Sequence, residues 1–102
     1  MSLWSDARTC AVAERGEQCE NCGSRVKIEA HHMFFPARRG KKKMPEVDVA
    51  ENLMLVCKAC HPMMKGYDKR CWYWDVQVRR YGEERMRAWY DGVPLMHKER
   101  LW

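Results

Sequence analysis

Two periodicities divide the first part of the chain into helical and extended segments. Between residues 3 and 15, apolar side chains recur at positions 3, 4, 7, 10, 11 and 12, close to the 3.6-residue repeat of an α-helix. Positions 26, 28 and 30 are apolar and alternate with charged residues, which is the two-residue repeat of a β-strand. The sequence therefore predicts a helix that ends at Gly16 and a strand that leads into two adjacent histidines, His31 and His32.

The second half of the chain begins with a short apolar run and continues with helical patterns. The segment NLMLVC predicts a short buried strand or turn, and KACHPMMKG predicts one short helix. Residues 68–92 predict two amphipathic helices, whose aromatic residues have the spacing of a core rather than of a base-stacking platform. Residues 36–48 have no such pattern and are typical of a long, functional loop. We therefore expect a single α+β domain over residues 1–102.

The net charge of the chain indicates which class of partner it binds. The 102 residues include 19 Lys and Arg against 14 Asp and Glu, a net charge of +5, which favours an anionic partner, most commonly nucleic acid. We find no apolar run of 18 residues that indicates a membrane span, and no basic segment before an apolar one that indicates a signal peptide. We therefore expect a protein of the reducing cytoplasm, with no membrane partner.

Four of the six cysteines form two C-x-x-C pairs, Cys19 with Cys22 and Cys57 with Cys60. A C-x-x-C turn presents two thiolates on one side at a spacing that suits tetrahedral Zn²⁺. Redox thiols and disulfides seldom produce two such pairs, so the sequence predicts a structural zinc site that clamps two distant turns. The remaining two cysteines are expected to be buried small hydrophobic residues without chemistry: Cys10 and Cys71.

The zinc clamp would bring together polar residues that lie far apart in sequence. His31 and His32 follow the first cysteine pair, Asn52 precedes the second, and His61 follows Cys60 directly. In this order the segments CENCG, EAHHMFFP and ENLMLVCKACH, with the trailing Lys65, resemble the HNH endonucleases. These belong to the ββα-metal (His-Me finger) nucleases, and the resemblance is to the variant with two zinc-binding C-x-x-C pairs. It covers residues 19–65 and implies a zinc-stapled ββα-metal core, flanked by an N-terminal helix and a C-terminal helical extension, 68–92.

The resemblance implies a metal-dependent DNA endonuclease that hydrolyses phosphodiester bonds. It assigns His32 as the general base, Asn52 as the residue that orients this base, and His61 as a ligand of one divalent ion. This ion would be Mg²⁺, Mn²⁺ or a similar transition metal, and His31 occupies the position of its second ligand. The swapped assignment, with His31 as the base, stays open. Neighbouring strand residues point to opposite faces, so we expect a bend or bulge at the histidine pair if both serve one site.

Three further features of the sequence affect the expected ligands of the ion and the expected contacts with DNA. Some family members carry another histidine where this chain has Lys65, so the ion would be held by two imidazoles and more water or phosphate. Glu29, beside apolar Ala30, is interpreted as a solvated residue outside the site. Together with Lys65, the basic loop after the histidines is expected to contact the phosphate backbone without reading its sequence. The basic residues of this loop are Arg38, Arg39, Lys41, Lys42 and Lys43.

Two other functions are compatible with the sequence. One is a zinc-knuckle nucleic-acid-binding module without catalysis, and the other is a protein-interaction zinc finger. For a nuclease of this size, one active site nicks a single strand, and a double-strand cut takes a homodimer or two events. The small size suits phage packaging, restriction or a mobile element in a bacterial or phage-infected cell.

Overall fold

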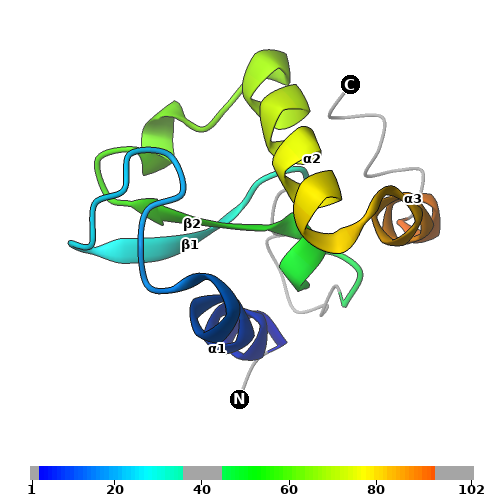
Figure 1. The fold of residues 1–102 in the computed structure, drawn as a ribbon, viewed down its shortest axis with the longest axis horizontal. Coiled ribbons are helices and arrows are strands. Elements are labelled where there is room, and N and C mark those ends of the chain that lie inside the picture. Colours follow the sequence, from blue (N-terminus) through cyan, green and yellow to red (C-terminus); the bar gives the residue numbers. More distant parts are fainter. Residues whose placement is uncertain (1–2, 36–44, 94–102) are drawn as a thin grey trace.

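The chain folds around an antiparallel pair of strands with helices packed about it. The computed structural model describes residues 3–35 and 45–93. Their elements in chain order are α1 (Leu3–Arg15), β1 (Ile28–His32), the 3₁₀ turn η1 (Ala50–Asn52), β2 (Leu53–Cys57), the 3₁₀ turn η2 (His61–Met63), α2 (Tyr67–Tyr81) and α3 (Glu83–Gly92). In Figure 1, α1 lies below the strands, α2 crosses them, and α3 follows beyond α2. Helices together with an antiparallel sheet confirm the α+β class, whereas the HNH core within it stays a prediction.

The two strands pair in an uninterrupted register, from Ile28 opposite Cys57 to His32 opposite Leu53. All five residues of β2 are buried, as in a strand that is covered on both faces. The bend or bulge expected at the histidine pair is not seen, because His31 and His32 both continue the ladder. Their side chains therefore leave β1 on opposite faces.

The first cysteine turn packs along the outer edge of β2. The backbone N–H of Glu20 donates to the carbonyl of Leu55 at 2.8 Å, and the N–H of Leu55 donates to the Glu20 carboxylate at 2.7 Å. The same carboxylate accepts hydrogen bonds from Arg15 of α1 and from Tyr73 and Arg80 of α2. One acidic side chain thus joins two helices to the edge of β2.

Helix α1 has its predicted bounds, and most of its predicted apolar face packs inward, with Trp4, Ala7 and Val12 against the core. Ala11 is buried, and Arg8 and Arg15 also point toward the hairpin, where each guanidinium donates to a strand carbonyl. Cys10 is exposed, so the prediction that it is buried was wrong. The apolar pattern failed here because it counts arginines as outward-facing, whereas these two satisfy strand carbonyls.

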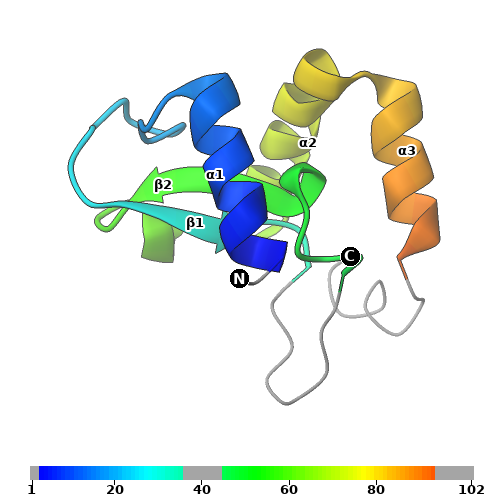
Figure 2. The same ribbon diagram turned by 90° about the horizontal axis from the view of Figure 1, so that it is seen from below.

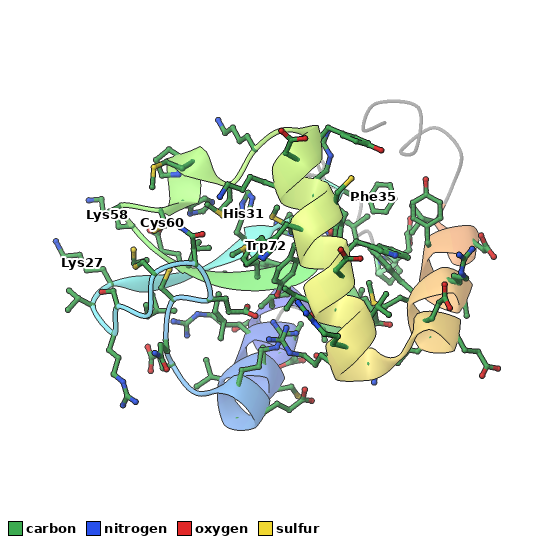
Figure 3. The ribbon with its side chains drawn as sticks, turned by 45° about the horizontal axis from the view of Figure 1, so that its top comes forward. Lys27, His31, Phe35, Lys58, Cys60 and Trp72 are labelled. Carbon is green, nitrogen blue, oxygen red and sulfur yellow. The ribbon has the colours of Figure 1, made fainter. Side chains whose placement is uncertain are left out.

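Helices α2 and α3 confirm the predicted helical extension and lie side by side (Figure 2). Aromatic side chains of both helices pack against the core. Phe34 and Phe35 lie just after β1, separated from it by Met33, and both are buried. They make edge contacts with Trp74 of α2 and Trp89 of α3 respectively. Figure 3 shows Phe35 in the space between these two helices. Most aromatic residues of the extension therefore serve the core, as predicted, whereas Cys71 is partly exposed rather than buried. Within the described residues, no helix has the length and apolar character needed to cross a membrane.

Candidate metal centres and histidine site

The four predicted zinc ligands come together at one end of the hairpin. Two lie in the turn before β1, one ends β2, and one follows it; their sulfur atoms all lie within 4.8 Å of one another. Tetrahedral Zn²⁺ with Zn–S bonds of about 2.3 Å would space its sulfur ligands about 3.8 Å apart. The sulfurs of Cys22 and Cys57 are 3.7 Å apart. Cys19, Cys22, Cys57 and Cys60 could therefore hold a structural metal such as zinc.

N–H groups around the cluster favour the thiolate form that metal binding needs. The backbone N–H of Cys22 donates to the sulfur of Cys19 at 3.4 Å, and the Asn21 side-chain amide donates to the sulfur of Cys60 at 3.3 Å. Burial raises the pKa of Cys19, but hydrogen bonds from backbone N–H groups outweigh it and lower the pKa to about 6. A backbone hydrogen bond at Ser24 lowers the pKa of Cys22, but its contacts with the other three cysteine sulfurs outweigh this and raise the pKa to about 12. The thiolate is therefore favoured at Cys19 rather than at every sulfur of the cluster.

A second group of side chains lies on the face of β1 that carries His31. The Nδ1 atom of His31 is 3.0 Å from the Nε2 atom of His61, which begins η2 directly after Cys60. Figure 3 shows His31 between Cys60 and the start of α2. The cysteine turns and the hairpin ladder thus bring together two histidines that are 30 residues apart.

The outer nitrogens of this pair already have acceptors. The Nε2 atom of His31 lies 3.0 Å from the Met64 carbonyl oxygen, and the Nδ1 atom of His61 lies 2.8 Å from a carboxylate oxygen of Glu29. Both oxygens can only accept, so each outer nitrogen carries the proton, and a neutral imidazole then has its lone pair on the inner nitrogen. Two lone pairs 3.0 Å apart repel each other unless a proton or a metal ion lies between them.

The pair has the geometry of two neighbouring ligands on one ion. Around an octahedral ion with bonds of about 2.1 Å, adjacent ligand atoms are about 3.0 Å apart, which is the separation of the two inner nitrogens. Burial lowers the pKa of His31, and although its bond to Met64 opposes this, the nearby His61, His32 and Lys65 lower it further. His31 is therefore neutral at physiological pH, which is the state that binds metal.

His32 has a different set of partners. Its Nε2 atom is 2.8 Å from a carboxylate oxygen of Asp48, and its ring stacks on Trp4 of α1 with centroids 3.6 Å apart and planes 13° from parallel. Burial lowers the pKa of His32, while the bond to Asp48 partly opposes this shift. His32 is thus a neutral imidazole whose Nε2 proton points to Asp48.

Asn52 is fully buried and acts on backbone groups. Its side-chain oxygen accepts from the N–H groups of Phe34 and Phe35 at 2.8 and 3.0 Å, and its side-chain N–H groups donate to the carbonyls of Phe35 and Val47 at 2.8 and 2.9 Å. We call this set of four bonds the Asn52 latch. Within the described residues, the Asn52 amide has no hydrogen bond to either imidazole, so any orienting effect on His32 passes through the backbone.

Two carboxylates that bond the histidines, Glu29 and Asp48, were not predicted from the sequence. Glu29, interpreted as a solvated residue, instead bonds His61, and alternation could have indicated this because Glu29 and His31 share one face of β1. Asp48 lies in a segment without periodicity, so no sequence signal pointed to it. Lys65 is exposed. The five basic loop residues between 38 and 43 lie outside the described residues.

Comparison of the chain with protein-family models, with curated proteins and with solved structures gives no match.

Proposed function

We propose that the chain is a metal-dependent DNA endonuclease of the HNH type, which hydrolyses phosphodiester bonds with one divalent ion. The observation that carries the proposal is the His31–His61 pair. Its inner nitrogens face each other at ligand spacing, and its outer nitrogens are held by Met64 and Glu29. Hydrogen bonding of the outer N–H is what metal-ligating histidines commonly show, and it fixes both tautomer and ring direction.

In this proposal His31 and His61 hold the divalent ion through their inner nitrogens. When bound, the ion would stabilise negative charge on the phosphate and on the leaving oxygen. Water and phosphate would complete its coordination, because the position of a further family histidine is Lys65. The exposed ammonium group of Lys65 adds positive charge beside His31, where a phosphate would approach.

The same contacts support His32 rather than His31 as the general base. Both ring nitrogens of His31 are engaged, one by Met64 and one by His61. Of the two nitrogens of His32, Nε2 is engaged by Asp48, and within the described residues Nδ1 has no partner. A neutral imidazole with a free Nδ1 can take a proton from water. His32 is the last residue of β1, so its ring lies at the strand end rather than in the middle of a face.

DNA is the substrate class that fits the charge. The net charge of +5 favours a polyanion, and contacts from Lys65 and the basic loop would position the phosphate backbone without specifying sequence. One such site cuts one strand, so nicking is the expected elementary event.

The test is conversion of supercoiled plasmid to the nicked form with Mg²⁺ or Mn²⁺. We expect His32→Ala to lower the nicking rate by about 10²-fold or more, because it removes the general base. DNA binding should be retained. His61→Ala should lose both nicking and affinity for the second ion. Arg87→Ala, which removes an exposed cation from α3, is the control and should nick normally. A folded, metal-loaded wild-type protein that leaves the plasmid intact would refute the proposal.

The alternative function, a zinc-knuckle nucleic-acid-binding module, needs only the cysteine cluster and the net charge. It predicts DNA binding without nicking in the wild type and no effect of His32→Ala. The nicking assay therefore separates the two functions in a single comparison.

A further inference from the structure

We infer that Asp48 is a positioning residue for the imidazole of His32, and that Trp4 fixes the plane of the same ring. This inference rests on the proposed function for its catalytic meaning. The arrangement itself is visible without it, as a carboxylate, an imidazole and an indole brought together from three separate segments. Through Trp4, helix α1 contacts His32 although α1 lies outside the motif core.

Two contacts restrict the ring in different ways. The 2.8 Å contact between Asp48 and Nε2 selects the tautomer with the proton on Nε2, because a carboxylate accepts and cannot donate. The nearly parallel indole of Trp4 opposes rotation of the ring out of its plane. Both side chains of this hydrogen bond are largely shielded from water, with exposed fractions of 16% for His32 and 23% for Asp48. Shielding strengthens such a bond relative to one in bulk water.

The combined result is that Nδ1 carries the lone pair and points away from Asp48. A general base needs a defined nitrogen in a defined direction, because proton transfer requires hydrogen-bond reach to the water. A carboxylate behind a catalytic imidazole supplies this in hydrolases of unrelated folds. Through its bond to Nε2, Asp48 would supply the same orientation here.

The backbone on both sides of Asp48 is held by Asn52, a residue of the HNH motif. The Asn52 side chain donates to the carbonyl of Val47, and the Asn52 backbone N–H donates to the carbonyl of Val49 at 3.1 Å. The residues on both sides of Asp48 are therefore bonded to Asn52. This explains how Asn52 can orient His32 without contacting its ring: the latch holds the backbone of Asp48, and Asp48 holds the imidazole.

The test compares Asp48→Ala and Asp48→Glu with the wild type, and Asp75→Ala, an exposed carboxylate on α2, serves as the control. The first readout is the tautomer of His32, taken from long-range proton–nitrogen NMR correlations on the neutral ring. We expect the Nε2–H form in the wild type and in Asp75→Ala, a mixture of tautomers in Asp48→Ala, and recovery of the Nε2–H form in Asp48→Glu.

The second readout is single-site nicking with zinc and the second ion saturating. Asp48→Ala should lower kcat by about tenfold or more, up to the roughly 10²–10⁴-fold ascribed to the general base itself, and leave KM unchanged, with partial recovery in Asp48→Glu. Trp4→Ala should lower kcat without changing the tautomer. If Asp48→Ala keeps the Nε2–H tautomer, the inference is overturned whatever the nicking shows. If the wild type nicks no DNA, the proposed function fails, and the NMR comparison alone decides whether Asp48 orients His32.

Discussion

Glu29 and Asp48 each accept a hydrogen bond from one histidine, Glu29 from His61 and Asp48 from His32. The two carboxylates act on opposite faces of β1, since His31 and His32 leave the strand in opposite directions. One face would then hold the ion and the other would orient the base. Without a bend at the histidine pair, the proposed function requires substrate to contact both faces around the end of β1, where His32 is the last residue.

Replacing Glu29 tests the face that would hold the ion. We expect Glu29→Gln to weaken binding of the second divalent ion by about 10- to 100-fold, the usual effect of removing the partner of a ligating histidine. The measurement is Mn²⁺ titration followed by electron paramagnetic resonance, with the cysteine site already filled by zinc. Glu84→Gln, an exposed change on α3, should bind Mn²⁺ normally. Equal affinities in both variants would remove Glu29 from the site.

Replacing Asn52 tests the latch. Asn52→Ala leaves two buried N–H groups and two carbonyls without their partner, and we expect the free energy of unfolding to fall by about 4 kcal/mol or more, since each of the four orphaned groups costs about 1–3 kcal/mol. Urea denaturation measures this. Stability and nicking should fall together, in contrast to His32→Ala, which should lose nicking alone. Full stability with lost nicking would assign Asn52 a chemical role instead.

At the scale of elements, α1, α2 and β2 meet at the Glu20 carboxylate. Its partner Arg15 has a side-chain exposure of 4%, and Arg15 also donates to the carbonyls of Leu53 and Ala50. Tyr73 adds its hydroxyl to the same group of contacts. The interior of this part of the molecule is therefore polar, and both terminal nitrogens of Arg15 are hydrogen-bonded there, whereas its buried Nε has no partner within the described residues.

We predict that removing the Glu20 carboxylate greatly lowers the stability of the fold. Glu20→Ala leaves a buried guanidinium without its anion, and we expect the free energy of unfolding to fall by about 3–5 kcal/mol. The matched control is Glu83→Ala, which breaks the exposed pair with Arg87, where both side chains are more than half exposed, and should cost about 0.5 kcal/mol or less. Similar losses in the two variants would mean that burial adds nothing to the Glu20 cluster.

The residues of this cluster could not be predicted from the sequence, because they are polar and buried. Apolar periodicity predicted α1, β1, β2 and both C-terminal helices, because most of their core positions are apolar. It failed where polar groups turn inward: Arg15, Glu20 and the buried Gln77, which bonds the carbonyls of Ala50 and Glu51. Motif spacing predicted the cysteine cluster and the proximity of His31 to His61. It could not predict Asp48, whose position depends on the latch rather than on any repeat.

At the scale of the whole molecule, the cysteine cluster joins the segment before β1 to the segment after β2. We expect one tightly bound zinc ion per chain, measured by elemental analysis, and loss of cooperative thermal unfolding after strong chelation, because structural zinc binding is part of the folding free energy of small domains. Cys57→Ser should behave like the chelated protein, whereas Cys10→Ser, at an exposed cysteine away from the cluster, should keep its zinc. A stable fold without metal would contradict this.

The hairpin is thus fastened at both ends, by cysteines at one and by the Asn52 latch at the other. The latch holds the backbone at Phe35 and at Val47, so the length of chain between these residues is not dictated by the strands. Doubling the length of a flexible loop costs only about 0.6 kcal/mol. A chain built this way can exchange the intervening segment for a longer or differently charged one while the histidines stay in register. Under the proposed function, a change in the nucleic acid that the protein would bind need not disturb the groups that would cut it.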